Sequence, residues 1–382
     1  MDIDHSTGKC MEGRPGSPGR ALGFVAIICI FCVTACSGIN KDRVGPDNAA
    51  DQHYKKELSE SREMWFITPE KARDMVQNEA QILDARHYAE YALSHVSGAR
   101  NISWKDFVQE GTGLLVDRSH LLDLLLDETL RPEGSIVVYG AALEGWGEEG
   151  RIAWMLRKAG FAQTYIVNGG FEKLHPLLGL TYGPAAGEQE VLAKNSRQSI
   201  FPGRNSRKGI TDSVDISNQE LNDIRQKATV IVIDGREQRE YLGQTPYGET
   251  RGGHIPGAIH IYFKDFLRKD GRILSLPELK ELLISYPAIQ TAIENLRQEG
   301  SGNTNRSSPD SVAPSGSDIT DEEIQRLIFV SYCTGGVRSA FITAVLRHHG
   351  LNARNYSGGM WQWSRGSNSE FPLTAGQSDS RP

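Results

Sequence analysis

The sequence contains an internal repeat, and this repeat restricts the fold more than any other feature of the chain. Four segments recur in the same order in its two halves: ILDAR with VIDGR, HVSGARNI with HIPGAIHI, MLRKAGF with VLRHHGL, and VNGGFEKL with YSGGMWQW. Such self-similarity indicates two copies of one structural unit. Each copy spans roughly 120–170 residues, which is enough for a core of its own.

Both copies alternate short apolar segments with segments of helical periodicity. In the first copy, Thr68 and Pro69 suit the N-cap and first turn of a helix, QILDAR and SIVVYG are typical of strands, and EGRIAWMLRKAGF predicts a helix that stops at Gly160. In the second copy, TVIVIDGR and RLIFVSYC predict strands, and ISNQELNDIRQK and RSAFITAVLRHHGL predict helices. Strands that alternate with helices predict a parallel α/β sheet in each copy.

Composition marks the segments around these two units. A polar stretch without apolar periodicity follows residue 36 and predicts a flexible tether, and Gly, Ser, Asn and Pro dominate a stretch before the last predicted strand. The predicted boundaries are 1–35 for a signal peptide, 36–62 for the tether, 63–177 for an N-terminal domain, 178–208 for a linker and 209–370 for a C-terminal domain, with a disordered insertion near 298–318.

The N-terminal region has the order of a secretory signal. Arg14 and Arg20 precede an uncharged apolar run of fifteen residues, from Ala21 to Ala35, which is short for a membrane-spanning helix of ~20 residues. The run ends in VTAC, which resembles a bacterial lipobox and makes Cys36 the expected site of lipid attachment. A plain signal peptide or a short membrane anchor is the alternative, and Met1 and Met11 are both candidate start residues.

The cysteine distribution draws attention to one residue. Four of the five cysteines lie within the first 36 residues, and the fifth is Cys333. Exported proteins usually pair their cysteines, so a single thiol in the mature chain suggests chemistry rather than a disulfide. An inert buried cysteine is the alternative. The net charge of −6 argues against broad binding of nucleic acid.

Cys333 opens the segment CTGGVRS between a predicted strand and a predicted helix. Backbone N–H groups at such a turn converge on an anion, and the positive end of the following helix adds to them. Gly335 and Gly336 allow the necessary backbone conformations, while Val337 completes the loop. Thr334 and Ser339 offer hydroxyls and Arg338 a fixed positive charge, so the thiol should have a lowered pKa and act as a nucleophile.

The repeat and the motifs DGREQREYLG, RGGHIPGAIHI, CTGGVRS and YSGGMWQW together resemble the rhodanese sulfurtransferases, over nearly the whole chain from Trp65 to Trp363. The resemblance implies two tandem α/β domains, each with a central parallel sheet and helices on both faces. It also implies that the C-terminal domain is the active one and that Cys333 carries a persulfide. Related phosphatases place five residues between cysteine and arginine; here there are four, which disfavours a phosphatase.

The first copy has glycine in the place of the nucleophile. Alignment of SIVVYG with FVSYC puts Gly140 where Cys333 stands, and the loop after it, AALEGWGEEG, is longer and carries three glutamates. Acidic side chains oppose the binding of an anion, so this domain is predicted to be catalytically silent. A second active site built on these glutamates is the alternative.

Other polar residues have a structural and a functional interpretation. Asp234 and Arg236 end a strand, and their repetition in the first copy favours a structural role. Arg251 could meet an anionic substrate, whereas His254 is expected to pack and to form hydrogen bonds. No metal site is expected from the paired histidines at the end of a helix. Trp361 and Trp363 are expected in the core, and a place in the lining of a domain cleft is the alternative.

These features predict an exported bacterial lipoprotein with sulfurtransferase activity, on the periplasmic side of a membrane, with the outer membrane favoured by Ser37 after Cys36. Sulfur would move from a small donor, thiosulfate in preference to 3-mercaptopyruvate, through Cys333 to cyanide or a thiol, without a cofactor. The chain departs from both donor classes. Glu240 stands before Tyr241, next to Arg239, where mercaptopyruvate enzymes tend to have arginine, and Thr334 and Gly335 follow the cysteine where thiosulfate enzymes often have basic residues. The chain is expected to be a monomer and not to bind nucleic acid. A non-enzymatic persulfide carrier or binding module is the alternative.

Overall fold

The computed structural model describes residues 63–183, 214–300 and 319–376, all of which belong to one compact unit, Tyr54–Pro382. The predicted signal peptide, the whole predicted tether with Cys36, most of the predicted linker and most of the predicted insertion lie outside the described residues. Across the part of the chain that the structure describes, no helix is both long and apolar enough to cross a membrane.

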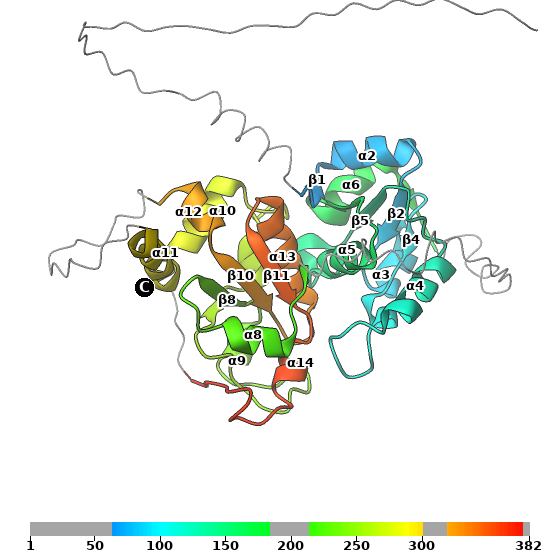
Figure 1. Ribbon diagram of the computed structural model, residues 1–382. Helices are drawn as coiled ribbons and strands as arrows, with labels where there is room; N and C mark the ends of the chain where they lie inside the picture. The colour runs from blue at the N-terminus through cyan, green and yellow to red at the C-terminus, as the bar shows by residue number, and fades with distance from the viewer. Residues whose placement is uncertain (1–62, 184–213, 301–318, 377–382) are drawn as a thin grey trace, which may run out of the picture. The chain divides into compact units, whose positions relative to one another are not determined.

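The N-terminal domain is built on a five-stranded parallel sheet with the strand order β1-β6-β5-β2-β4 (Figure 1). The strands are β1 Phe66–Ile67, β2 Gln81–Asp84, β4 Arg100–Asn101, β5 Ile136–Tyr139 and β6 Thr164–Val167. The helices are α2 Pro69–Gln77, α3 Tyr88–Leu93, α4 Arg118–Asp127, α5 Glu148–Ala159 and α6 Gly170–Leu178. Thr68 caps α2 by accepting a hydrogen bond from the backbone of Lys71, as its sequence predicts.

The C-terminal domain repeats this plan with a four-stranded parallel sheet in the order β11-β10-β8-β9. Its strands are β8 Val230–Asp234, β9 Ile259–His260, β10 Ile328–Tyr332 and β11 Asn352–Tyr356. Its helices are α8 Asn218–Ile224, α9 Gln238–Tyr241, α10 Leu276–Ile284, α11 Pro287–Gly300, α12 Asp321–Gln325, α13 Val337–His348 and α14 Gly359–Trp363. Two parallel α/β units in tandem confirm the predicted fold class.

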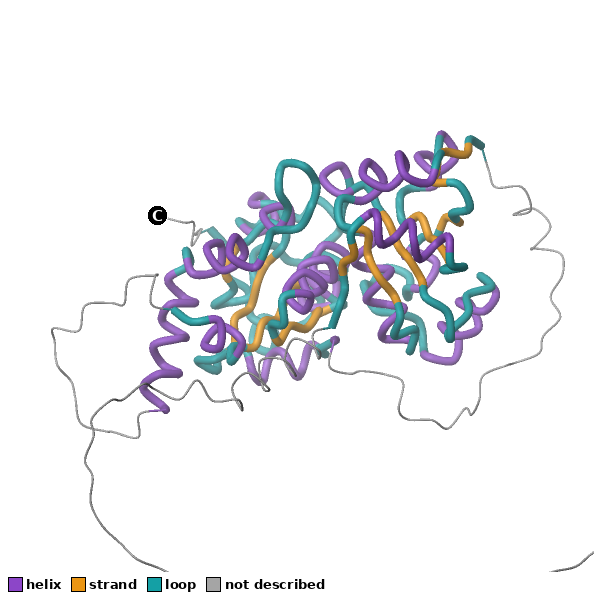
Figure 2. The backbone as a smooth tube through the Cα atoms, turned by 90° about the horizontal axis from the view of Figure 1, so that it is seen from above, coloured by secondary structure: helices purple, strands orange, loops and turns teal. Residues whose placement is uncertain are grey.

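Helices cover both faces of each sheet, as the tube in Figure 2 shows. In β5, Ile136 and Val138 pack in one apolar cluster with residues of α4 and α5, while Val137 and Tyr139 face a second cluster with residues of α2 and α6. The alternation follows from the period of two along a strand. A strand that is buried on both faces must be apolar throughout, which is the pattern of SIVVYG.

One apolar core continues from the first domain into the second. It joins residues of α5, such as Ile152, to residues of α13, such as Phe341, and reaches α10 and α11 beyond them. The two helices pack along each other, and Gly150 lies so close to α13 that a methyl group there would overlap the backbone of Phe341. The two domains therefore share one apolar interface in which their cores are continuous.

The same polar network occurs in both domains at the carboxyl ends of two neighbouring strands. Arg236 donates to Asp234 through two nitrogens, with the shortest contact at 2.7 Å, and Tyr332 donates to the same carboxylate at 2.7 Å. In the first domain the corresponding residues are Arg86, Asp84 and Tyr139, with contacts of 2.6 and 2.7 Å. Because the pair is built identically in a domain without the cysteine, its contacts belong to the fold.

Three predicted boundaries differ from the structure. The predicted linker begins with a short strand, β7 Leu180–Thr181, which pairs antiparallel with β3 His95–Val96, so its first residues belong to the N-terminal domain. The predicted insertion starts inside α11, which continues to Gly300. Finally, Thr374 pairs with His254 beyond the predicted end of the C-terminal domain. Backbone pairing at domain edges leaves little trace in composition, which explains the first and third differences.

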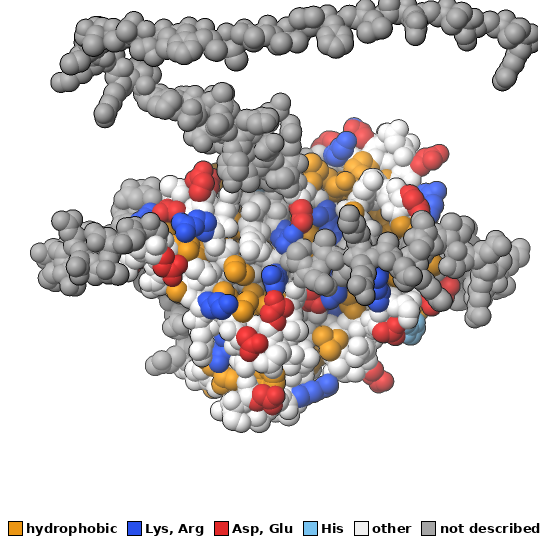
Figure 3. Space-filling model, viewed as in Figure 1, with side chains coloured by type: hydrophobic (Ala, Val, Ile, Leu, Met, Phe, Trp, Pro, Cys, Tyr) orange, Lys and Arg blue, Asp and Glu red, His pale blue; other side chains and the backbone are white. Residues whose placement is uncertain are grey.

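Charged side chains of both signs are interspersed on the face shown in Figure 3. Several charged side chains of the described residues form ion pairs, including Arg268 with Glu278 and Lys280 with Asp321. Exposed pairs of this kind contribute about 0–1 kcal/mol each to stability, so the interior rather than the surface determines the fold.

Candidate active site

Cys333 follows the last residue of β10, at the carboxyl end of the parallel sheet, where α/β proteins place their sites. The loop ends at Gly336, which caps α13 with a φ of 79°, a conformation that favours glycine. Gly335 is needed for a different reason, because a Cβ there would overlap the ring of Trp361. The four loop residues after the cysteine therefore turn tightly into the helix, with Val337 at its first position.

The thiol of Cys333 is free and almost fully buried, with 1% of its surface exposed. Burial raises the pKa of the thiol, but the positive charge of Arg338 and hydrogen bonds from Ser339 and from the backbone of Gly335 outweigh that effect. The pKa of Cys333 consequently lies below the ordinary value for a cysteine. The loop thus favours the thiolate, which is the nucleophilic form.

The hydroxyl of Ser339 lies 3.6 Å from the sulfur of Cys333 and 2.7 Å from Oδ1 of Asn355. A hydroxyl has one hydrogen to donate, so it can serve only one of these acceptors at a time. Asn355, on β11, also donates to the carbonyl of Gly336 at 3.2 Å. Ser339 can therefore turn toward the sulfur when the sulfur is anionic while Asn355 keeps the loop in place.

Arg338 lies on the other side of the loop and is 4% exposed. Its guanidinium binds Glu240 with two nitrogens, at 2.6 and 2.8 Å, and donates to the hydroxyl of Thr334 at 2.8 Å. Thr334 in turn donates to Glu240 at 2.5 Å. This arrangement fixes the side chain of Arg338 and offsets part of its charge, because the ion pair is buried.

Two aromatic side chains whose role the sequence does not predict lie near the guanidinium of Arg338. Its guanidinium carbon lies 5.3 Å from the ring centre of Trp146 and 5.8 Å from that of Tyr247. Trp146 comes from the loop after β5 in the N-terminal domain and is 41% exposed. Trp361 donates its indole N–H to the carbonyl of Tyr247 at 2.8 Å, so it borders the loop rather than the core expected for it, whereas Trp363 is fully buried.

The sequence also does not predict that two carboxylates, Glu240 and Glu249, lie together at the loop. Glu249 is 6% exposed, and the hydroxyl of Thr334 lies 3.3 Å from its carboxylate and 2.5 Å from that of Glu240. In the sequence, Glu240 stands out only because it takes the place of an arginine before Tyr241. The sequence signal for the role of Glu240 is the replacement of arginine by glutamate, since a carboxylate at this position can pair with Arg338 and an arginine could not.

Arg251 and His254 form their contacts outside the loop of Cys333. Arg251 donates to the carbonyls of Ser364, Trp363 and Phe371, and so ties the C-terminal segment to its own loop. Its contacts are those of a structural residue. His254 stacks on Tyr241 with ring centres 3.8 Å apart.

The corresponding loop of the N-terminal domain holds a carboxyl group in place of a thiol. Gly140 follows β5 as Cys333 follows β10, and a Cβ at Gly140 would overlap the carboxylate of Glu149. Glu149 is 3% exposed, and its Oε2 has no partner among the described residues. Burial raises the pKa of Glu149 to about 8, and the nearby Glu148 adds to this effect. The side chain of Glu149 therefore fills the space inside this loop.

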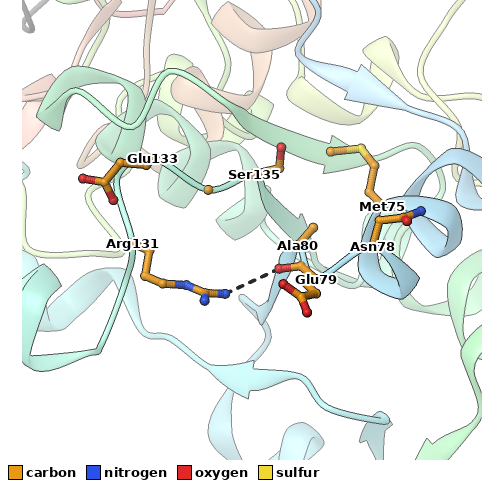
Figure 4. A pocket seen from close by; sticks show the side chains of 8 residues that line it. Met75, Asn78, Glu79, Ala80, Arg131, Glu133 and Ser135 are labelled. Atoms are coloured by element: carbon orange, nitrogen blue, oxygen red, sulfur yellow. Dashed lines mark hydrogen bonds between the residues drawn. The ribbon is translucent and has the colours of Figure 1, made fainter. Parts of the chain in front are cut away.

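A surface hollow of about 450 Å³ lies elsewhere in the N-terminal domain (Figure 4). It is bounded by the end of α2 and by the residues that precede β2 and β5, and Arg131 reaches across it to the carbonyl of Glu79 at 3.5 Å. This is the amino end of the sheet, opposite to the edge at which Gly140 lies. The described residues that line the hollow include no cysteine.

A family model of the rhodanese-like domain matches residues 68–176 and 217–365, which are the two repeated units. The chain belongs to the rhodanese-like family. Among the curated relatives of this rhodanese, the thiosulfate sulfurtransferase of Mus musculus is 27% identical over 235 residues, which cover 55% of this chain and 73% of the relative. The thiosulfate sulfurtransferase of Corynebacterium glutamicum is 22% identical over 303 residues, with coverage of 75% and 82%.

Solved structures share the fold of this rhodanese. The 3-mercaptopyruvate sulfurtransferase of Leishmania major matches with a TM-score of 0.54 and 20% identity, covering 79% of this chain and 74% of that one. SseA of Escherichia coli, described as a 3-mercaptopyruvate sulfotransferase, matches with a TM-score of 0.55 and 18% identity, covering 78% and 98%. At the level of the family, this chain is a sulfurtransferase.

Proposed function

We propose that Cys333 is the nucleophile of this sulfurtransferase and that it carries the transferred sulfur as a persulfide. The observation that supports this most directly is the loop around the thiol. A buried free cysteine with a lowered pKa accepts hydrogen bonds from Ser339 and from the backbone of Gly335 next to the charge of Arg338. A persulfide is also an anion, so the donors that stabilise a thiolate suit it as well.

The reaction takes place in two displacements. The thiolate of Cys333 attacks the outer sulfur of thiosulfate, a sulfur–sulfur bond forms to the protein, and sulfite leaves with the electron pair of the bond that breaks. The acceptor then attacks the outer sulfur of the persulfide. With cyanide, a carbon–sulfur bond forms, thiocyanate leaves, and the thiolate of Cys333 is restored. No external oxidant, reductant or cofactor takes part in this balance.

Thiosulfate is the proposed donor, in preference to 3-mercaptopyruvate. The two curated relatives described above carry the name thiosulfate sulfurtransferase. In addition, Glu240 stands where the resemblance to mercaptopyruvate enzymes calls for arginine, and its carboxylate is occupied by Arg338. The loop therefore lacks the second arginine that would bind the carboxylate of a 2-oxo acid.

The N-terminal domain is proposed to be catalytically silent. Gly140 removes the nucleophile, and the side chain of Glu149 takes up the space that a cysteine side chain would need. A protonated, buried carboxyl group offers neither a thiolate nor room for an anionic donor. This domain acts instead through its contacts with the second one.

The envelope location is proposed from the leader sequence. The basic residues, the apolar run 21–35 and the VTAC sequence fit cleavage before Cys36 and attachment of lipid to its thiol. Residues 36–62 would then tether a monomeric enzyme on the periplasmic side of a membrane, with the outer membrane favoured by Ser37. Its partners there would be small sulfur donors and thiol acceptors.

Intact-mass measurement with a turnover assay tests the proposed function. After incubation with thiosulfate, the protein should gain the mass of one sulfur atom on the peptide that carries Cys333, and cyanide should remove it with repeated turnover. The Cys333→Ser protein should show neither event while it keeps the melting temperature of the wild type. Loading of one sulfur without turnover would instead support a persulfide carrier, and loading of the Cys333→Ser protein would refute the assignment of the nucleophile.

A further inference from the structure

Arg151 belongs to the N-terminal domain, yet its guanidinium reaches the loop of Cys333. It lies on α5 with no exposed surface and donates to the carbonyl of Gly336, the cap of α13, at 3.4 Å. It also donates to the carbonyl of Gly113 at 2.5 Å. Gly113 lies in an N-terminal loop so close to Gly335 that a Cβ there would overlap its carbonyl. Arg151 thus binds a loop of its own domain and the candidate catalytic loop together.

The positive charge of Arg151 has no dedicated counter-ion. No carboxylate lies within ion-pair distance of it among the residues that the structure describes, and its Nε has no hydrogen-bond partner there. Burial lowers the pKa of Arg151 to about 10, so the side chain remains a cation at neutral pH. Burying an unpaired cation is unfavourable, and such a group calls for a compensating negative charge.

The groups that supply negative charge near Arg151 are Asp215 and the thiolate of Cys333. Asp215 already forms an ion pair with Lys158. The other cation of the loop, Arg338, is matched by Glu240. Among the described residues, Arg151 therefore remains a buried cation without an ion-pair partner, and it lies against Gly336 in the loop of Cys333, while Arg338 exerts the main effect of charge on the thiol.

The packing of the two domains explains how Arg151 reaches this position. Gly150 allows α5 to lie directly against α13 at Phe341, and Arg151 is the next residue along the helix. Its guanidinium carbon stacks over Trp154 at 4.6 Å, which holds the side chain toward the loop. A helix of the silent domain therefore extends into the region behind the loop of Cys333.

We propose that Arg151 is a positioning residue for sulfur transfer: it holds the Gly336 carbonyl and supplies a positive charge from the first domain that favours the anion on Cys333. This inference rests on the proposed role of Cys333, and it makes the silent domain part of the active site. Arg151 acts through the loop and through its charge, without contact to the donor.

Replacement of Arg151 by methionine in the full chain tests the proposal, because methionine keeps much of the apolar volume and removes the charge. Alkylation of Cys333 by iodoacetamide is followed against pH on the peptide that carries this residue, so that the leader cysteines do not interfere. We expect the midpoint of the Arg151→Met protein to rise by about one pH unit and sulfur loading from thiosulfate at neutral pH to slow about tenfold. The Arg151→Lys protein should keep a midpoint near that of the wild type but load sulfur more slowly, because an ammonium group cannot bind both carbonyls in the geometry of a guanidinium.

Arg157 on the same helix provides a matched control. It is mostly buried and donates to the carbonyls of Met64 and Thr164 within the N-terminal domain. The Arg157→Met protein should lose thermal stability and keep the alkylation profile of the wild type. The proposal would be overturned by a folded Arg151→Met protein whose profile and loading rate match the wild type.

Two further outcomes separate the role of Arg151 from a failure of the variant to fold and from a failure of the proposed donor. If the Arg151→Met protein does not fold, an Arg151→Lys protein with the loading rate of the wild type overturns the proposal. If thiosulfate loads no sulfur onto the wild type but the alkylation midpoint still moves in Arg151→Met, the proposed donor fails while the role of Arg151 stands.

Discussion

Arg338 and Glu240 form a two-point ion pair beside the loop of Cys333, with N–O distances of 2.6 and 2.8 Å and both side chains buried. The same guanidinium acts on the sulfur of Cys333 through its charge. A structural and a catalytic interpretation of Arg338 are therefore not alternatives. The side chain anchors α9 to α13 through Glu240 and favours the thiolate at the same time.

Replacement of Arg338 by alanine should affect both stability and reactivity. It leaves Glu240 as an unpaired buried carboxylate, so we expect a loss of about 3–5 kcal/mol in the free energy of unfolding. It also removes the main positive charge near Cys333, so the pKa of the thiol should rise. Denaturant unfolding and the pH profile of iodoacetamide alkylation measure the two effects. A destabilised protein with an unchanged alkylation profile would show that Arg338 has only a structural role.

Replacement of Glu240 by glutamine should shift the pKa of Cys333 in the opposite direction. The carboxylate offsets the charge of Arg338, whereas an amide keeps a hydrogen-bond acceptor without negative charge. With less of its charge neutralised, Arg338 should lower the pKa of the thiol below that of the wild type. The same alkylation profile tests this expectation. A rise in the midpoint would mean that Glu240 acts mainly by holding Arg338 in place.

Glu149 should make the stability of the protein depend on pH. The pKa of its carboxyl group is about 8 in the folded protein, against an ordinary value of 4.5. The folded state therefore binds the proton more tightly than the unfolded chain does. The stabilising contribution is complete below about pH 4.5 and is lost as the pH rises through about 8.

The Glu149→Gln protein should lack this dependence. Relative to the wild type it should gain at least about 1 kcal/mol of stability between about pH 5 and about pH 8.5, measured by denaturant unfolding at both values. The Glu172→Gln protein, altered at an exposed glutamate of α6, is the control. Parallel pH curves for the wild type and the Glu149→Gln protein would contradict the assignment of a raised pKa.

Cys36 should be required for attachment to the membrane. If it carries the lipid, the Cys36→Ala protein should accumulate unprocessed and should not incorporate a fatty-acid analogue in metabolic labelling. The Cys32→Ala protein, altered within the apolar run, should be labelled like the wild type. Labelling that survives in the Cys36→Ala protein would refute the lipoprotein assignment.

The sequence was sufficient to predict the features that depend on local pattern. Apolar runs and their helical neighbours predicted the sheets, and Thr68 with Pro69 predicted the start of α2, because capping involves residues close in the chain. The position of Cys333 between a strand and a helix was predictable for the same reason, whereas its role as the nucleophile stays a prediction. A thiol, two glycines and an arginine within a few residues carry their chemistry locally.

Contacts between distant residues were not predictable from the pattern alone. Arg151 lies on an amphipathic helix, and periodicity does not indicate which neighbour its buried face will meet. Trp361 and Trp363 stand two residues apart on α14, yet only Trp363 enters the core, because the rotation of a short helix is set by tertiary packing. The role of Glu240 likewise depends on Arg338, almost a hundred positions further along the chain.

The close contact of Gly150 with Phe341 limits how the protein can be recombined with its relatives. In a chimera that joins the first half of a relative to the second half of this chain, any side chain larger than a hydrogen atom at the position of Gly150 would push α5 away from α13. The exchangeable unit is therefore not the sequence repeat. It is the pair of α5 and α13, which have to be transplanted together.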